Sequence, residues 1–188
     1  NSPSGEPDFR TALSALQTEL PAAKSGLLIS SWFGNDLRCE TCEIKPKVEY
    51  TSVDGQEQPW SVTGVTRDTA EEVVRLLDSP VYGGTPSDTS MLQAIAAMNA
   101  VGQSVVFYPF LLMEQLEGNS LPDPWSDATD QPVLPWRGRI TLSKAPDQVG
   151  TTDRTAAAEA EVAAFFGTAQ ASDFTVTPGS VSYTGPAE

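Results

Sequence analysis

Two nearly uninterrupted apolar runs of strand length constrain the fold of this chain more than any other sequence feature. The first spans residues 26–33 and the second spans residues 104–113. Because neither run alternates with polar residues, each is typical of a strand covered on both faces, as in a parallel sheet. Before the second run, the pattern predicts an amphipathic helix with Ser87 as its N-cap and Gly102 just beyond its end. Strand, helix and strand in this order predict a βαβ unit and an α/β fold.

Other elements are predicted around this unit. Apolar residues recur on one helical face over residues 8–20, which predicts a helix that Pro21 ends. Short β-type segments on either side of Asp54 and Gly55 predict a β-hairpin excursion from the main sheet. The remaining predictions are helices at 69–77 and 155–166, a long polar loop at 114–135 and a short strand at 137–142. Because no internal repeat or linker divides the chain, we expect a single segment over residues 1–188.

The acidic composition argues against several classes of partner. The 188 residues carry 11 basic and 25 acidic side chains, a formal charge of −14, and the basic residues form no cluster. A phosphate backbone attracts a basic surface, so we expect no nucleic-acid partner. No run approaches the roughly 18 apolar residues of a membrane-spanning helix, so we expect no transmembrane segment.

The absence of histidine removes most of the common catalytic sites. Ser-His-Asp triads, Cys-His dyads and His-based zinc sites all depend on an imidazole. Any catalysis by this chain must therefore use carboxylates, tyrosine, lysine or arginine.

Cys39 and Cys42 form a CxxC motif without partner cysteines or histidines. Two thiols alone cannot supply the four ligands of a structural zinc site, so either a local disulfide or a pair of packed thiols is expected. Asp123, Asp127 and Asp130 lack the D-x-D-x-D-G spacing of a calcium loop and are interpreted as solvated charges. We expect no metal and no cofactor.

An acidic residue follows each of the two predicted strands. Asp36 comes shortly after the first strand, and Glu114 comes directly after the second. In β/α barrels the active site forms at the carboxyl ends of the strands, and a glycosidase uses two carboxylates about 5–9.5 Å apart. Asp36 and Glu114 are therefore the candidate catalytic pair, although polar residues also end most strands for solvation alone.

Aromatic residues are candidates for stacking on sugar rings. Trp32 and Tyr108 lie within the predicted strands, where packing in or near the core is the usual role. Trp125 and Trp136 lie in or next to the long loop and are the candidates for carbohydrate or partner contact. Arg137 forms the only compact basic pair, with Arg139, and is a candidate contact for an anionic sugar or for this chain's own carboxylates.

A series of short segments carries a family resemblance over nearly the whole chain. The segments resemble the TIM-barrel-like domain of the megatron, or host-specificity, tail-tip protein of gene transfer agents and related siphophages of the Rhodobacterales. In order, they are LISSWFGNDLRC (28–39), YGGTPSD (82–88), FYPFLLM (107–113), GNSLPDP (118–124), PWRGRI (135–140), DRTAA (153–157) and VAAFFG (162–167).

The resemblance implies part of a TIM-barrel-like α/β domain with long loop insertions, the barrel continuing beyond residue 188. It also implies a structural and host-contact component of a phage-like tail tip, located in the particle tail. The implied partners are other tail-tip proteins in a trimeric assembly and bacterial envelope polysaccharide.

The family domain is described as glycoside-hydrolase-like, which leaves two alternatives open. One is a glycoside hydrolase acting on cell-surface polysaccharide or peptidoglycan, and the other is a non-catalytic carbohydrate-binding module. Because part of a barrel cannot by itself enclose a water-restricted site, we expect no glycosidase activity from this segment alone.

Overall fold

The computed structural model describes residues 3–135, 139–177 and 180–186. The chain forms two compact units and passes between them three times. The first unit contains the residues up to Phe33 together with Lys45–Leu112, and the second contains Gly34–Ile44 and the residues from Met113 onward. Each unit is described separately below.

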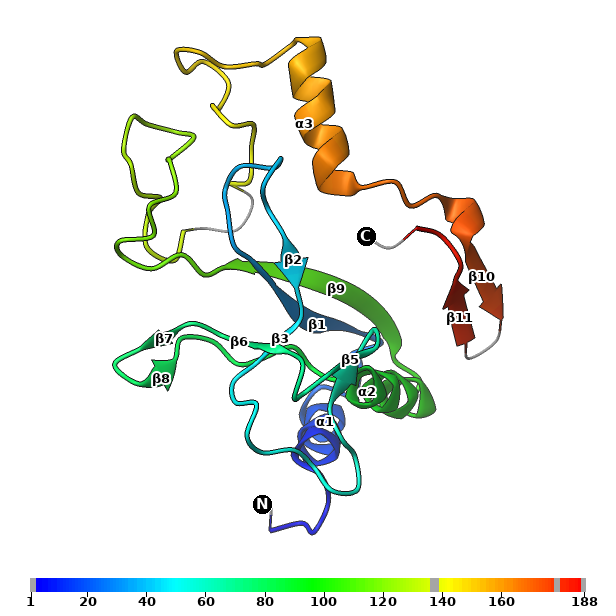
Figure 1. The fold of residues 1–188 in the computed structure, drawn as a ribbon. Coiled ribbons are helices and arrows are strands. Elements are labelled where there is room, and N and C mark those ends of the chain that lie inside the picture. Colours follow the sequence, from blue (N-terminus) through cyan, green and yellow to red (C-terminus); the bar gives the residue numbers. More distant parts are fainter. Residues whose placement is uncertain (1–2, 136–138, 178–179, 187–188) are drawn as a thin grey trace. The chain divides into compact units, whose positions relative to one another are not determined.

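The first unit contains the predicted βαβ elements. Helix α1 (Asp8–Glu19) precedes strand β1 (Ser25–Gly34), and helix α2 (Asp88–Ala100) leads into strand β9 (Ser104–Met113). Figure 1 shows α1 and α2 together on one side of β1 and β9. These four elements confirm the helices and strands predicted from the apolar patterns.

Local sequence signals explain where α2 begins and ends. The Ser87 hydroxyl accepts a hydrogen bond from the Ser90 amide, which satisfies one free N–H group of the first turn. Gly102 follows the helix with a φ of 77°, a left-handed conformation that side chains with a Cβ disfavour. The chain then enters β9 within two residues.

Strands β1 and β9 are parallel neighbours in a three-stranded sheet of order β2-β1-β9, where β2 is Ile44–Lys45. The Ser104 amide donates to the Lys24 carbonyl at one end, and the Glu114 amide donates to the Gly34 carbonyl at the other. From one bond to the other, both strands advance by the same number of residues, so a single register holds along the whole pair.

This register leaves one face of the strand pair exposed. It places Leu27 and Ile29 on the same face as Val106 and Tyr108. Their exposed fractions are 57, 49, 53 and 41%, respectively. The prediction that both faces of these strands are covered is therefore wrong here. On the opposite face α2 packs closely, since a Cβ on Gly26 would collide with the Met98 methyl.

Pro109 marks the free edge of the pair. Ser104 and Glu114 both donate to β1, so the even-numbered residues of β9 direct their backbone groups toward β1. The odd-numbered residues, including Pro109, direct theirs away from β1. Proline has no N–H group, but at position 109 that group would point away from β1, so the β1–β9 ladder loses no hydrogen bond. On the outer edge of β9, the missing donor interrupts the row that a further strand would need for pairing.

A small apolar cluster forms the core of the first unit. Val48, Trp60 and Val62 are buried in it, and Trp32, Val65 and Ala70 pack against them. Two-residue strands supply Val48, Val62 and Val65. The two-residue strands of this unit form three pairs. Strand β3 (Lys47–Val48) pairs in parallel with β6 (Glu71–Glu72). The other two pairs are antiparallel: β4 (Ser61–Val62) with β5 (Val65–Thr66), and β7 (Arg75–Leu76) with β8 (Ser79–Pro80).

The predicted hairpin around Asp54 and the predicted helix at 69–77 are both wrong. The Asp54 carboxylate accepts hydrogen bonds from the Gly55 and Trp60 amides, which forms a side-chain-capped loop in place of a strand turn. Leu77 and Asp78 have φ values of 51° and 61°, so they form the tight turn between β7 and β8. Residues 71–72 and 75–76, which the predicted helix would include, belong instead to the strands β6 and β7.

The expectation of a TIM-barrel-like domain is also wrong. The strands of the described residues make one three-stranded sheet and four two-stranded sheets, with no closed barrel. A barrel needs eight long parallel strands that pair all the way round. Between β1 and β9, only the two-residue strand β2 joins this sheet among the described residues, and the other short strands pair with one another in separate two-stranded sheets.

The second unit has little regular structure before its carboxyl-terminal part. The predicted helix at 155–166 is confirmed as α3 (Ala156–Phe166), which ends at Gly167 with a φ of 65°. A short 3₁₀ turn, η1 (Ala171–Asp173), then leads to the hairpin of β10 (Phe174–Thr177) and β11 (Ser180–Tyr183).

Of the strand predicted at 137–142, the described part contributes a single bridge, between Thr141 and Arg38. In the described ranges, no helix combines the length and the apolar character needed to cross a bilayer.

Candidate functional site

The candidate site lies at the carboxyl ends of β1 and β9. The sequence indicates Asp36 and Glu114 because active sites of β/α barrels form at the carboxyl ends of the strands and a glycosidase uses two carboxylates. Both residues belong to the second unit, as do the loops that pack around them. The site can therefore be described within one unit.

The Asp36 carboxylate is buried, with 3% of the residue exposed, and several groups donate to it. Arg38 donates from its backbone amide, from Nε at 3.1 Å and from Nη2 at 2.6 Å. The Thr41 hydroxyl and Gln131 Nε2 each donate at 2.7 Å. Burial alone would raise the pKa of Asp36, but the hydrogen bonds from Arg38, Gln131 and Thr41 outweigh it and hold this pKa below its ordinary value.

Gln131 joins the loop after β1 to the long polar loop. Its Oε1 accepts from the Leu37 amide at 2.9 Å, while its Nε2 donates to Asp36 and to the Pro122 carbonyl. The Asn119 side chain in turn accepts from the Gln131 amide and donates to the Gln131 carbonyl. Asp36 therefore fixes two loops in place, and its oxygens are engaged with neighbouring side chains.

Glu114 and Gln115 follow β9 and are both buried. The Glu114 amide donates to Gly34 at 3.3 Å, which continues the β1–β9 ladder, and the Gln115 carbonyl accepts from the Leu134 amide. The side-chain amide of Gln115 has no hydrogen-bond partner among the residues that the structure describes. Retaining or inverting glycoside hydrolysis needs one carboxyl group that exchanges a proton and one that stays ionised. Asp36, held in an ion pair, does not supply the exchanging group.

Cys39 and Cys42 are free thiols in the structure. Cys39 is buried and its amide donates to the Thr141 carbonyl at 2.7 Å. Burial raises the pKa of both thiols, which lowers the fraction of reactive thiolate. Within the described part of the chain, no group of three or more Cys, Asp or Glu residues is arranged to hold a metal ion.

Trp125 is the one candidate contact residue that falls within the described ranges. It is 36% exposed, its ring N–H donates to the Arg139 carbonyl, and the Arg139 guanidinium lies 5.3 Å from the ring centre. Trp136 and Arg137 lie outside the described residues. Of the strand aromatics, Trp32 packs against the apolar cluster, whereas Tyr108 is exposed and contacts Phe110 edge-on.

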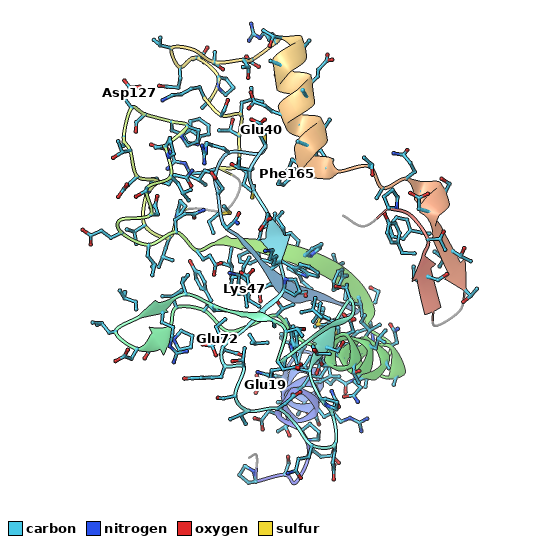
Figure 2. The ribbon with its side chains drawn as sticks, viewed as in Figure 1. Glu19, Glu40, Lys47, Glu72, Asp127 and Phe165 are labelled. Atoms are coloured by element: carbon cyan, nitrogen blue, oxygen red, sulfur yellow. The ribbon has the colours of Figure 1, made fainter. Side chains whose placement is uncertain are left out.

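The acidic residues of the long loop have structural partners. Asp123 is buried and accepts hydrogen bonds from the Trp125 amide and the Ser126 hydroxyl. Asp130 accepts from the Ser120 amide. Asp127 is fully exposed on this loop, 3.4 Å from the Lys144 ammonium (Figure 2). Asp127 is therefore the solvated charge that the sequence predicts, whereas for the buried Asp123 this interpretation is wrong.

Glu161 is a buried acid that the sequence reasoning missed. It lies on α3 and accepts from the Ser143 amide at 2.6 Å, the Ser143 hydroxyl at 3.1 Å and the Thr152 hydroxyl at 2.7 Å. Burial raises its pKa, but these hydrogen bonds outweigh that effect and leave it lowered. Glu161 lies three residues after Ala158 and four residues before Phe165, a spacing that places all three on one face of the helix. The apolar character of Ala158 and Phe165 was the sequence signal that this face is turned inward.

The comparisons with known proteins add no family assignment. The chain matches no protein-family model, and a search of curated proteins finds no match to it.

Proposed function

We propose that this chain is a structural and host-contact component of a phage-like tail tip. The support from the sequence is the ordered series of segments over residues 28–167 that resembles the tail-tip protein of gene transfer agents and related siphophages. In this role the chain contacts other tail-tip proteins in a trimeric assembly, and it is located in the particle tail. Bacterial envelope polysaccharide is the external ligand.

The observation that carries the proposal is the apolar surface that each unit leaves exposed. In the first unit, Leu27 and Ile29 of β1 lie on the same face as Val106 and Tyr108 of β9, and all four are exposed. In the second unit, Val176 and Val181 face each other across the β10–β11 hairpin and are both exposed. Monomeric proteins rarely leave such surface in contact with water, whereas a component of an assembly covers it with neighbouring subunits.

The candidate site also supports a structural role. The side chains around Asp36 hold two loops together through an ion pair and several hydrogen bonds. Such an arrangement keeps the loops after β1 and β9 in fixed positions. Fixed loops suit recognition of a partner more than acid-base chemistry, which needs a carboxyl group free to exchange its proton.

Localisation on the particle tests the proposal directly. Antibodies raised against residues 1–188 are applied to purified particles from a host that encodes the chain, and bound antibody is located by immunogold electron microscopy. We expect label at the tail end and reduced adsorption to host cells, while antibodies against the capsid label only the head. Particles without label, or label confined to the head, would contradict the proposal.

An assay for reducing sugar separates this role from the enzyme alternative. Host envelope polysaccharide is incubated with the chain and with its Glu114→Gln variant, and we expect no release of sugar from either. Release by the parent chain that is lost in Glu114→Gln, with an unchanged circular dichroism spectrum, would replace the proposal with a glycoside hydrolase.

A further inference from the structure

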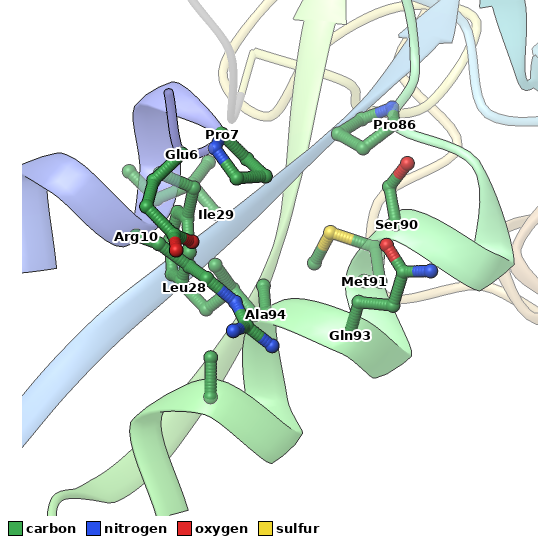
Figure 3. A pocket seen from close by; sticks show the side chains of 12 residues that line it. Glu6, Pro7, Arg10, Leu28, Ile29, Pro86, Ser90, Met91, Gln93 and Ala94 are labelled. Atoms are coloured by element: carbon green, nitrogen blue, oxygen red, sulfur yellow. The ribbon is translucent and has the colours of Figure 1, made fainter. Parts of the chain in front are cut away.

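A cleft of about 680 Å³ lies in the first unit, between the start of α1, strand β1 and the first half of α2 (Figure 3). This volume is within the range of about 300–1,000 Å³ that is typical of small-molecule sites. The cleft is separate from the carboxyl ends of β1 and β9 and from the loops around Asp36.

The floor of the cleft is apolar. Leu28 comes from the face of β1 against which α2 packs, and Met91, Ala94 and Ala97 come from successive turns of α2. The two alanines have short side chains, which leaves open space above α2. Transfer of an aliphatic chain from water to such a floor is favourable by about 0.8 kcal/mol for each CH₂ group buried.

The rim of the cleft carries one cation, Arg10. Its guanidinium extends from α1 across the cleft toward α2 (Figure 3). Within the described ranges, the structure shows no hydrogen bond or ion pair for this side chain. The first turn of α2, from Asp88, also borders the cleft, and the positive end of a helix favours an anion there.

The opposite rim is held in one arrangement by a chain of hydrogen bonds. The Ser87 and Ser90 hydroxyls are bonded to each other, Gln58 donates to Ser90, and Gln93 donates to Gln58. Because these groups satisfy one another, they shape the cleft without requiring a ligand. Of the two charged side chains of the rim, Glu6 and Arg10, only Arg10 can pair with an anionic ligand.

We propose that this cleft binds an apolar carboxylate, of the medium-chain fatty acid class. The carboxylate pairs with the Arg10 guanidinium, and the aliphatic chain lies along Leu28, Met91 and Ala94. Glu6, the acidic residue of the rim, repels the bound carboxylate and lowers its affinity. This proposal does not rest on the tail-tip role.

The test is calorimetric titration of the chain with decanoate, with 1-decanol as the uncharged ligand of the same length. We expect saturable one-site binding of decanoate and at least tenfold weaker binding of decanol, because decanol cannot form the charge-assisted pair. Equal affinity for the two ligands, or no saturable binding of decanoate, would overturn the proposal.

Charge variants of the rim give effects of opposite sign. Arg10→Gln is expected to weaken decanoate binding about tenfold, and Glu6→Gln is expected to strengthen it a few-fold by removing a like charge. Both positions are exposed, so the variants keep the fold. Weaker binding in Glu6→Gln, or unchanged binding in Arg10→Gln, would show that the anion is not bound at this rim.

A third pair of variants tests the floor. Ala94→Trp fills the cleft and is expected to abolish binding, whereas Ala96→Trp, on an exposed position of α2 that does not line the cleft, is expected to bind as the parent does. Loss of binding in both variants, or in neither, would contradict the assigned position.

Discussion

The two units bury their irregular segments by different means. In the first unit, the segments around Val48, Trp60 and Val62 converge on an apolar cluster, and two-residue strands are enough to hold them. In the second unit, the segments around Asp36 and Gln131 are joined by an ion pair and side-chain hydrogen bonds. Neither region contains a long helix or strand.

The difference determines how each region responds to change. Removing apolar atoms from a cluster costs the transfer free energy of those atoms and the energy of the cavity that remains. Removing one member of a buried polar network leaves its partners without hydrogen bonds, so a change of a single atom is costly. The first unit should therefore be sensitive to side-chain volume and the second to side-chain chemistry.

The largest effect is expected for Trp60→Ala in the apolar cluster. This change removes the largest buried side chain of the cluster and the hydrogen bond from its ring N–H to the Thr85 carbonyl. We expect a loss of about 3–5 kcal/mol in the free energy of unfolding, measured by urea denaturation. The matched change Trp125→Ala, at an exposed tryptophan, should cost less than about 1 kcal/mol. Equal losses at the two tryptophans would show that the cluster is not the core.

The next largest loss of stability is expected for Asp36→Asn in the polar network, a change that keeps the size of the side chain. The neutral amide loses the charge pairing with Arg38, and its NH₂ group faces donors from Thr41 or Gln131. We expect a loss of about 2–3 kcal/mol by urea denaturation. The control Asp127→Asn, at a fully exposed position, should change stability by less than about 0.5 kcal/mol. A loss in Asp36→Asn no larger than in this control would remove the contrast between the two regions.

The variant Glu161→Gln tests whether stability is also sensitive to side-chain chemistry at helix α3. Glutamine keeps one acceptor oxygen, but its amide group cannot accept from Ser143 and Thr152 as the carboxylate does. We expect a loss of about 1–2 kcal/mol in the free energy of unfolding. The measurement is thermal unfolding monitored by circular dichroism. Glu159→Gln, an exposed change two residues earlier on the same helix, is the control. If both variants unfold at the same temperature as the parent, the buried bonds of Glu161 contribute nothing.

The smallest effect is a pH dependence in the first unit, where Glu71 pairs with Lys47 at 2.8 Å and with Lys45 at 2.9 Å. Hydrogen bonds from Lys47 and then Lys45 lower the pKa of Glu71 from 4.5 to about 2. Because the folded pKa lies below the unfolded one, this stabilisation is complete above pH 4.5 and is lost as the pH falls through 2. Glu71 is half exposed, so we expect a contribution of only about 1 kcal/mol.

The measurement for Glu71 is urea denaturation of the parent and of Glu71→Gln between pH 5 and pH 2. The difference in free energy of unfolding between them should shrink as the pH falls across this window. A difference that stays constant with pH would show that the carboxylate of Glu71 does not stabilise the fold through its charge.

Elements with local signals were predicted well. Ser87 and Gly102 bound α2, and Gly167 ends α3, because caps act through hydrogen bonds and φ angles within one or two turns. The segment between Lys47 and Pro80 was predicted poorly. Its turns at Thr63 and Leu77 use positive φ at residues other than glycine, which no local rule anticipates.

The candidate site was predicted in part. Proximity to the ends of the apolar runs correctly marked Asp36 and Glu114 as residues at the carboxyl ends of two adjacent strands. The partners of Asp36 were not predictable, since Gln131 lies 95 residues further along the chain. Glu161 was missed for the same reason, because its partners come from the loop before α3.

The sequence by itself determined the three helices, the two long strands and the absence of imidazole chemistry, since each depends on composition or on neighbours within a few residues. Only the tertiary structure decided which strand faces are covered, that the strands of the described residues form no closed barrel, and that Asp36 stabilises two loops. Burial and hydrogen-bond partners are set by segments far apart in the chain. The same apolar strand is therefore core or exposed surface depending on what packs against it.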